Sequence, residues 1–354
     1  MPQMMFRSVR HAALLAPLFV LASVAGTLAD EYGRVTLTEE NDSIVFPTDR
    51  YYTQGFEFAY LGPDVAGDSA FVAPFSGLAS IGMFGTPESA GESEGESAGE
   101  VSRRYQVIFG QSIFTPTDTD AEDPDPDDRP YAGWSYAGIG WVQDTDRRRL
   151  DNLELLVGIV GPAAQARPAQ NDWHQFIGVA DAEGWDRQIH NEPGLMLSYE
   201  RKYRLIQPLV GGFAVDAIPE AGVTLGNVMT YGEIGTMLRF GRNLEADYGP
   251  NRIRPSLSGT SYFNADYLED PFGFYVYVGG QGRAVAQNIF LDGNTFRDSR
   301  SVDKEVLVGD ITGGVALFWS NAVKLDAGFT YRTQEFEGQD DAAKFANINL
   351  TVGF

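Results

Sequence analysis

The last nine residues of the chain alternate between apolar side chains and small or polar ones. The apolar positions are Ala346, Ile348, Leu350, Val352 and Phe354. A period of two places the two sets on opposite faces of a β-strand, so this segment predicts a strand with one apolar and one wet face. A soluble barrel or sandwich shows the same alternation, so the pattern predicts the strand but not its surroundings.

Eleven further segments alternate in the same way, although less cleanly. They span residues 33–38, 53–61, 105–114, 131–142, 153–160, 195–203, 211–225, 231–241, 273–281, 306–319 and 323–333. With the last strand this makes about 12, and an even number puts both ends of the sheet on one side, as in single-chain bacterial barrels. The pattern therefore favours an all-β fold, an antiparallel transmembrane β-barrel.

Such a barrel alternates short periplasmic turns with longer outer loops. Counted from a periplasmic start, the outer loops are residues 39–52, 115–130, 161–192, 226–230, 283–304 and 334–344. The periplasmic links include residues 144–152, 204–208 and 320–321. This orientation decides which polar residues share a rim of the barrel.

The third outer loop contains a helical pattern. Apolar residues recur at helical spacing over residues 169–181, which predicts a short helix. We expect this helix to press Trp173 and Phe176 against the barrel or lipid and to present His174 beside them. Gly178 weakens the helix.

The start of the chain resembles an export signal. Arg7 and Arg10 precede a short apolar stretch over residues 12–26, and Thr27-Leu28-Ala29 resembles a cleavage site. A transmembrane helix needs about 20 apolar residues, more than this stretch offers. We therefore expect residues 1–29 to be a signal peptide and residues 30–354 to form a single outer-membrane β-barrel domain.

The composition excludes several classes of function. Removal of the signal would lower the net charge from −23 to −25, which argues against nucleic acid binding and against simple docking to an anionic membrane. The chain has no cysteine, so its chemistry must use oxygen and imidazole groups. The 40 Gly, 23 Phe, 16 Tyr and 5 Trp residues suit a barrel with aromatic girdles, and a large soluble β-sandwich is the alternative.

Two acidic stretches, residues 86–100 and 118–128, are of low complexity. Such segments bury too little apolar surface to offset the entropy of ordering, so we interpret them as solvated loops. The second could bind calcium, which favours carboxylate oxygens, but it lacks the spacing of a calcium loop.

The polar residues that could carry chemistry gather in the outer loops. Apart from the signal, the chain contains two histidines, His174 and His190, both in the third outer loop, and histidine is the usual general base near neutral pH. Asn41-Asp42 follows the first strand, and residues 49–53 introduce the second, so these segments share a rim with His174. The alternative interpretations are an ordinary loop histidine and a turn formed by Asn-Asp.

Five motifs resemble, in the same order, the outer-membrane lipid A 3'-O-deacylase family. They are Glu40-Asn41-Asp42-Ser43, Asp49-Arg50-Tyr51-Tyr52-Thr53-Gln54-Gly55, Gly161-Pro162, Asn171-Asp172-Trp173-His174-Gln175-Phe176-Ile177-Gly178 and Gly184-Trp185-Asp186-Arg187-Gln188. The resemblance extends from about residue 35 to Phe354, and its most specific part is the segment around the histidine.

The resemblance implies a twelve-stranded barrel in the outer membrane of a diderm bacterium. Its substrate would be lipid A or a related outer-leaflet glycolipid, from which it would remove an ester-linked acyloxyacyl chain with the help of calcium. His174 would be the base that activates water, with Asn41, Asp42 and Thr53 as its companions in the active site. The calcium ligands stay unassigned, and we expect a monomer.

The chain departs from the family pattern at two places. The basic pair of the second outer loop would fall on residues 118–123, which are acidic here. A carboxylate expected shortly after the histidine would fall on Val179-Ala180, with Asp181 adjacent. Two other hypotheses therefore stay open: a non-catalytic outer-membrane barrel, such as a small porin or a structural protein, and a soluble periplasmic β-protein.

Overall fold

The structure is a computed structural model that describes residues 33–44, 50–65, 78, 82–84, 100–255, 261–264, 267–268, 270–319 and 323–354. The expected signal peptide, the link at residues 320–321 and the acidic stretch before Glu100 lie outside the described residues.

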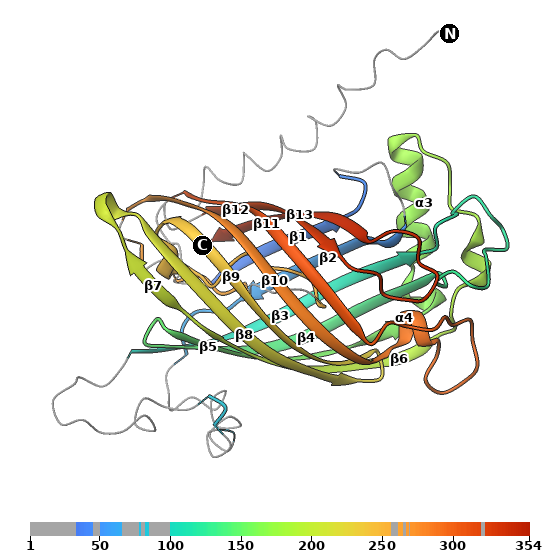
Figure 1. Ribbon diagram of the computed structural model, residues 1–354, viewed down its shortest axis with the longest axis horizontal. Coiled ribbons are helices and arrows are strands. Elements are labelled where there is room, and N and C mark those ends of the chain that lie inside the picture. Colours follow the sequence, from blue (N-terminus) through green and yellow to red (C-terminus); the bar gives the residue numbers. More distant parts are fainter. Residues whose placement is uncertain are drawn as a thin grey trace, which may run out of the picture.

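Thirteen strands form one antiparallel sheet in the described part of the chain (Figure 1). They are β1 (Arg34–Asn41), β2 (Tyr51–Leu61), β3 (Val101–Thr115), β4 (Ala132–Thr145), β5 (Arg149–Val160), β6 (Glu192–Tyr203), β7 (Leu205–Pro208), β8 (Ala214–Gly226), β9 (Met229–Arg242), β10 (Phe272–Asn288), β11 (Leu307–Trp319), β12 (Val323–Arg332) and β13 (Ala343–Gly353). The helical elements are η4 (Pro162–Ala164), α3 (Ala166–Ile177), η5 (Gly184–Arg187), η6 (Val210–Gly212), η7 (Leu244–Ala246) and α4 (Ile289–Asp292).

Twelve of the strands close into a ring. Each strand pairs with its neighbour in sequence, except that β6 pairs with β8, and β1 pairs with β13 to complete the barrel. We call the end that carries α3 and α4 the outer end, and the end at which β13 finishes the periplasmic end (Figure 1). The predicted twelve-stranded antiparallel β-barrel is confirmed.

Two boundaries differ from the prediction. The link at residues 204–208 contains the short strand β7, which pairs with the beginning of β8. Strand β10 continues to Asn288, into the predicted outer loop, because Arg283 faces the lumen and forms an ion pair with Asp310 at 2.8 Å. In the sequence, a charged residue such as Arg283 indicates a loop, because the partner that neutralises it lies on another strand and cannot be seen locally.

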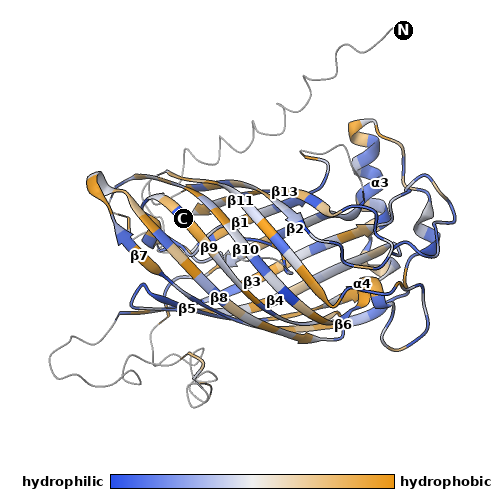
Figure 2. Cartoon of the chain, in the orientation of Figure 1, coloured by the Kyte–Doolittle hydropathy of each residue, from blue (hydrophilic) through white to orange (hydrophobic). Residues whose placement is uncertain are grey.

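Apolar and polar residues alternate along the strands (Figure 2), and the exposed large apolar side chains lie on the outer face of the wall. In β10, Val276 and Val278 are exposed on the outside, whereas Tyr275, Tyr277 and Gln281 are buried inside. This arrangement is typical of a barrel that crosses a membrane, because its outer face contacts lipid. No described helix is long and apolar enough to span a membrane.

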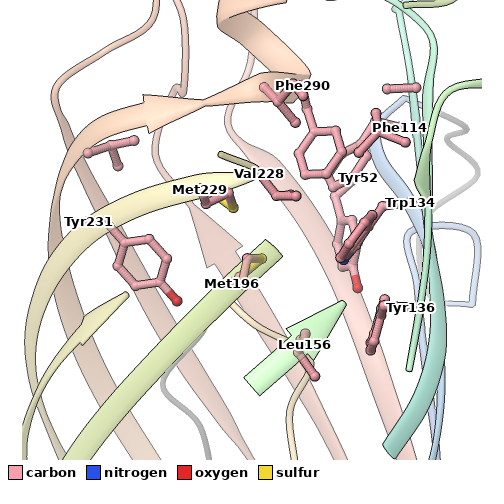
Figure 3. Close-up of a cluster of buried hydrophobic side chains, with 14 of the residues drawn as sticks. Tyr52, Phe114, Trp134, Tyr136, Leu156, Met196, Val228, Met229, Tyr231 and Phe290 are labelled. Atoms are coloured by element: carbon pink, nitrogen blue, oxygen red, sulfur yellow. The ribbon is translucent and has the colours of Figure 1, made fainter. Parts of the chain in front are cut away.

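An aromatic cluster fills the outer half of the lumen (Figure 3). The short helix α4 inserts Phe290, whose ring stacks on Phe114 of β3 with centroids 4.1 Å apart. Tyr52 packs against Phe114 and against Phe345 of β13. Between this cluster and the polar residues below it, the cavity beside Glu57 has a volume of only about 20 Å³.

We call the link between β9 and β10, residues 243–271, the lumen segment, because its described residues 243–255 and 261–264 turn back into the lumen from the periplasmic end. Near its start, Asp247 pairs with Arg239 at 2.5 Å and with Lys324. Farther along, Tyr248 and Tyr262 both donate hydrogen bonds to the carboxylate of Asp144. The interior of the barrel is therefore packed with protein from both ends.

Candidate active site

Helix α3 stands on the outside of the barrel wall, at the outer ends of β3 and β4 (Figure 1). In β4, Trp134 and Tyr136 face the lumen, so the alternating residues Gly133 and Ser135 face outward. The Ser135 hydroxyl donates a hydrogen bond to the Ala164 carbonyl just before the helix, at 2.7 Å. The third outer loop thus folds down over the lipid-facing side of the wall.

A glycine allows this close contact between helix and wall. A Cβ atom at Gly133 would lie 2.5 Å from Cβ of Ala166, in the first turn of α3. Real Cβ atoms do not approach so closely, so any side chain at this position would push the helix outward. Gly133 therefore sets how closely α3 approaches the strands.

The buried face of α3 contains Ala166, Gln170 and His174, which follow each other at intervals of four residues. Gln170 accepts a 2.8 Å hydrogen bond from the indole N–H of Trp185, which is itself fully buried in η5. The ring of Trp185 packs against Tyr131 at the start of β4. These contacts fix the rotation of α3 about its axis and turn His174 toward the barrel.

The C-terminal end of the helix is defined by Gly178. It adopts the left-handed conformation, with φ of 76°, and its N–H bonds to the carbonyl groups of Gln175 and His174. Glycine is the usual residue at this capping position. The glycine that was expected to weaken the helix therefore ends it.

Trp173 and Phe176 were expected against the barrel or lipid, and the structure excludes the barrel. The two rings stack on each other, with centroids 5.6 Å apart, and are 37% and 68% exposed. The helix contacts the wall through small residues such as Ala166, so its larger apolar side chains point away from the wall. Because that wall faces lipid, the pair lies on the lipid side of the site.

His174 is held in a defined orientation, 7% exposed, with Nδ1 2.6 Å from the carbonyl oxygen of Ala180. A carbonyl oxygen only accepts hydrogen bonds, so Nδ1 carries the proton in this contact and Nε2 is the basic nitrogen. The main chain at Ala180 thus orients the imidazole ring. Asp181 accepts a hydrogen bond from Gln175 at 3.0 Å instead.

The predicted companions of His174 lie at the outer ends of β1 and β2, and they are in contact with one another. The N–H of Asp42 donates to the carbonyl of Thr53 at 3.3 Å, and the carboxylate of Asp42 accepts from the N–H of Arg50 at 2.8 Å. Asn41 Oδ1 accepts from both the N–H and the hydroxyl of Ser43. The turn-forming interpretation of Asn41-Asp42 is therefore correct, and these bonds fix the orientation of the Asn41 amide.

Thr53 occupies a β-bulge in β2. Tyr52 pairs with Phe114 and Gln54 with Ile113, so Thr53 is the extra residue between them. Its hydroxyl lies 2.5 Å from the hydroxyl of Thr115 at the end of β3. Bulges often redirect a side chain next to an active site, and this one turns Thr53 to the outer face while Tyr52 points into the lumen.

The four predicted residues thus lie at one end and on one side of the barrel. Asn41, Asp42 and Thr53 are 7%, 2% and 4% exposed and connect β1 with β2, while His174 is supplied by α3 above the neighbouring β3 and β4. Thr115 also belongs to this group, although no pattern in the sequence marked it as a site residue. His190 is exposed, and its N–H donates to Asn294 in another outer loop.

Basic residues take different places from those of the family pattern. Arg50 contacts the site through its N–H and reaches Asp341 with its side chain, at 2.7 Å. Arg129, in the second outer loop, is fully buried over the ring of Phe114, and its burial lowers the pKa of its guanidinium group although Glu335 opposes this. Asp118 and its acidic neighbours are largely exposed on the loop surface.

The chemistry of the site suits calcium better than a transition metal. Asn41, Asp42 and Thr53 present amide, carboxylate and hydroxyl oxygens, the donors that calcium prefers. Within the described residues, no three His, Cys, Asp or Glu side chains gather closely enough to hold a metal ion.

A family model described as "Outer membrane protein LpxR" matches residues 12–354. The chain belongs to this family. Family membership and the barrel fold place the protein in the outer membrane, as the sequence predicted, and make it a lipid A deacylase-like protein.

Comparison of structures agrees with this. LpxR from Salmonella typhimurium is similar with a TM-score of 0.71 and 19% sequence identity, covering 91% of this chain and 100% of that one. The β domain of the Bordetella autotransporter BrkA is much less similar, with a TM-score of 0.42 and 10% identity over 91% of this chain and 98% of that one. No curated protein matches the sequence.

Proposed function

We propose that this LpxR family member hydrolyses an ester bond of lipid A, or of a related acylated glycolipid, and releases an acyloxyacyl chain. The observation that carries the proposal is the orientation of His174. Its Nδ1 is held by the Ala180 carbonyl, which leaves Nε2 as the base, and its helix stands on the lipid-facing wall. A histidine in this protonation state is suited to remove a proton from water near neutral pH.

The residues of β1 and β2 have complementary roles in this mechanism. Because Asn41 Oδ1 accepts two hydrogen bonds from Ser43, the NH₂ group of Asn41 points the other way, where it bonds to the Glu39 carboxylate and has a second hydrogen to donate to an oxyanion. Thr53 carries a hydroxyl oriented by Thr115. Asp42 adds a negative charge that attracts a cation.

Calcium is part of the proposal. Asp42 and Thr53 would hold the ion, which supplies positive charge for a developing oxyanion or for the phosphate groups of the substrate. The acidic second loop lacks the family's basic pair, so we expect this chain to depend on the cation for charge neutralisation.

The surroundings of the site suit a membrane-embedded substrate. Trp173 and Phe176 are exposed beside an outer wall that also exposes Phe56, Phe109 and Ile139. These side chains offer a continuous apolar surface for acyl chains while the polar rim of β1 and β2 meets the head group. Binding of a water-soluble ester would not require such an apolar surface.

A pore function is not favoured, because the lumen that a porin keeps open is packed with the aromatic cluster and the lumen segment. A non-catalytic structural barrel is the second candidate, and the acidic residues at the position of the family's basic pair are the observation in its favour.

The test is mass spectrometry of lipid A from cells that express the wild type or His174→Ala, with calcium present and then chelated. We expect the wild type to remove the mass of one acyloxyacyl unit, and both His174→Ala and chelation to abolish this loss. His190→Ala, which changes an exposed histidine of the same loop, is the matched control. Unmodified lipid A in cells with correctly folded wild-type protein would contradict the proposal and favour a structural role.

A further inference from the structure

The innermost part of the lumen segment, Asn251 to Ile253, reaches the strands that carry the candidate active site. The Asn251 amide donates to the Thr38 hydroxyl at 2.8 Å and to the Glu57 carboxylate at 3.1 Å. Arg252 donates from Nε to Glu40 at 2.5 Å, and the N–H of Ile253 bonds to the same carboxylate at 3.3 Å. A segment that enters from the periplasmic end therefore binds β1 and β2 from inside the barrel.

These contacts lie directly behind the site. Glu40 precedes Asn41, and alternate residues of a strand face opposite sides of the wall, so an anchor that holds Glu40 inward also keeps Asn41 outward. On β2, a Cβ atom at Gly55 would lie 2.9 Å from Ile253 Cδ1 and 1.9 Å from the Tyr52 hydroxyl. Ile253 and Tyr52 thus pack together behind the bulge at Thr53.

Arg252 also ties this end of β1 to β11 and β12, the strands that follow β13 in the ring. Its guanidinium NH1 donates to the hydroxyl groups of Thr312 on β11 and Thr330 on β12, at 3.1 and 2.9 Å. Both side chains of the Arg252–Glu40 pair are 1% exposed, so water does not compete for these bonds. Arg252 therefore connects β1 with β11 and β12 by non-covalent bonds on the lumen side, at the level of the site.

We infer that Arg252 is a positioning residue for the reaction: its ion pair with Glu40 holds the end of β1 so that Asn41 faces outward and the turn at Asp42 follows it in a fixed position. This inference rests on the proposed function, because it names the active site as what is positioned. The base itself, His174, is supplied by α3 and does not depend on this pair.

Arg254 provides the matched control, two residues farther along. Its guanidinium group bonds to Glu200 at 2.8 Å and lies 3.5 Å from both Glu154 and Glu233. Its side chain is 5% exposed, so it too is a buried cation of the lumen segment. However, its partners belong to β5, β6 and β9, away from β1 and β2.

The experiment compares Arg252→Ala with Arg254→Ala in the full-length protein, using two measurements. The first is kcat and KM for deacylation of purified lipid A in mixed micelles. The second is the mobility of a nitroxide label on Ile44→Cys, an exposed position two residues after Asp42 in a chain without native cysteine. The label reports on the β1 end whether or not the protein is active.

We expect Arg252→Ala to fold, to lose about 100-fold in kcat with little change in KM, and to make the label more mobile. Arg254→Ala should stay close to wild type in both measurements, and Arg252→Lys should restore part of the rate. If Arg252→Ala does not fold, the double variant Arg252→Gln with Glu40→Gln, which leaves no unpaired charge, is measured in the same way.

Two results would overturn the inference. One is a folded Arg252→Ala protein, or double variant, with wild-type kcat and an unchanged label. The other is an equal loss of rate and equal loosening of the label in Arg252→Ala and Arg254→Ala, which would mean that any buried cation of the lumen segment has the same effect. If the wild type does not deacylate lipid A, the proposed function fails, while the label still shows whether Arg252 holds the end of β1.

Discussion

The contact between Gly133 and Ala166 allows a quantitative prediction. In Gly133→Ala, the new methyl group would lie 2.5 Å from Cβ of Ala166. Ordinary contacts between such atoms begin near 3.4 Å, so α3 must move outward by about 1 Å. A displacement of about 1 Å in a catalytic group can reduce the rate by about 100-fold, and His174 moves with the helix.

The stability of the barrel should change much less than the activity. Overpacking typically costs about 1–3 kcal/mol, whereas replacing a strand glycine by alanine returns roughly 0.5–1 kcal/mol. The assay is the rate of lipid A deacylation in cells, measured by mass spectrometry. Heat-modifiable migration on gels, expected of a barrel that stays folded in detergent, verifies that each variant is folded.

Two further variants make this prediction specific. Gly232→Ala, on the outer face of β9, is the matched control, because a Cβ atom there meets no other atom within 4 Å. Ala166→Gly combined with Gly133→Ala removes the colliding methyl group, and the nearest remaining contact would be Ala164 at 3.3 Å, so activity should recover. Wild-type activity in a folded Gly133→Ala protein would refute the reasoning that this contact positions His174.

Two other predictions follow from the site. Thr115→Val removes the hydroxyl that contacts Thr53, and we expect a loss of about 1 kcal/mol of transition-state stabilisation, or roughly fivefold in kcat. The control is Thr224→Val, which removes a buried hydroxyl that bonds to Ser198 on the distant strand β6, and an unchanged rate in Thr115→Val would exclude a role for Thr115. Trp185→Phe removes the indole donor that bonds to the buried amide of Gln170. We expect the free energy of unfolding in urea to fall by about 1–3 kcal/mol and the rate of deacylation to fall with it. A protein as stable and active as wild type would show that this bond does not fix α3.

The strands were predictable from the sequence because apolar side chains recur at every second position on the lipid-facing wall. The rim of Asn41, Asp42 and His174 followed from the order of the strands alone. The face of α3 that contacts the barrel was not predictable, because it depends on Gly133, a distant residue whose only contribution is the absence of a side chain. Likewise, nothing periodic marks the bulge that turns Thr53 outward.

The lumen segment differs from an ordinary turn in its length and composition, which an analysis of periodicity does not consider. Residues 243–271 form a link far longer than the short periplasmic turns of such barrels, and tyrosine is more than twice as frequent in the link as in the whole chain. Length and composition together could have predicted that it folds into the interior. Its partners, such as Glu40 and Glu200, could not be predicted, because pairing across a lumen depends on the three-dimensional closure of the ring.

The position of α3 on the outer wall has a kinetic consequence. A site that opens sideways, neither upward into solvent nor inward to the lumen, receives its substrate by lateral diffusion within a single leaflet. Its rate then depends on the mole fraction of substrate among the surrounding lipids, and inert amphiphiles act as diluents even when the bulk concentration is constant. Turnover by this protein should accordingly be expressed per unit of membrane surface.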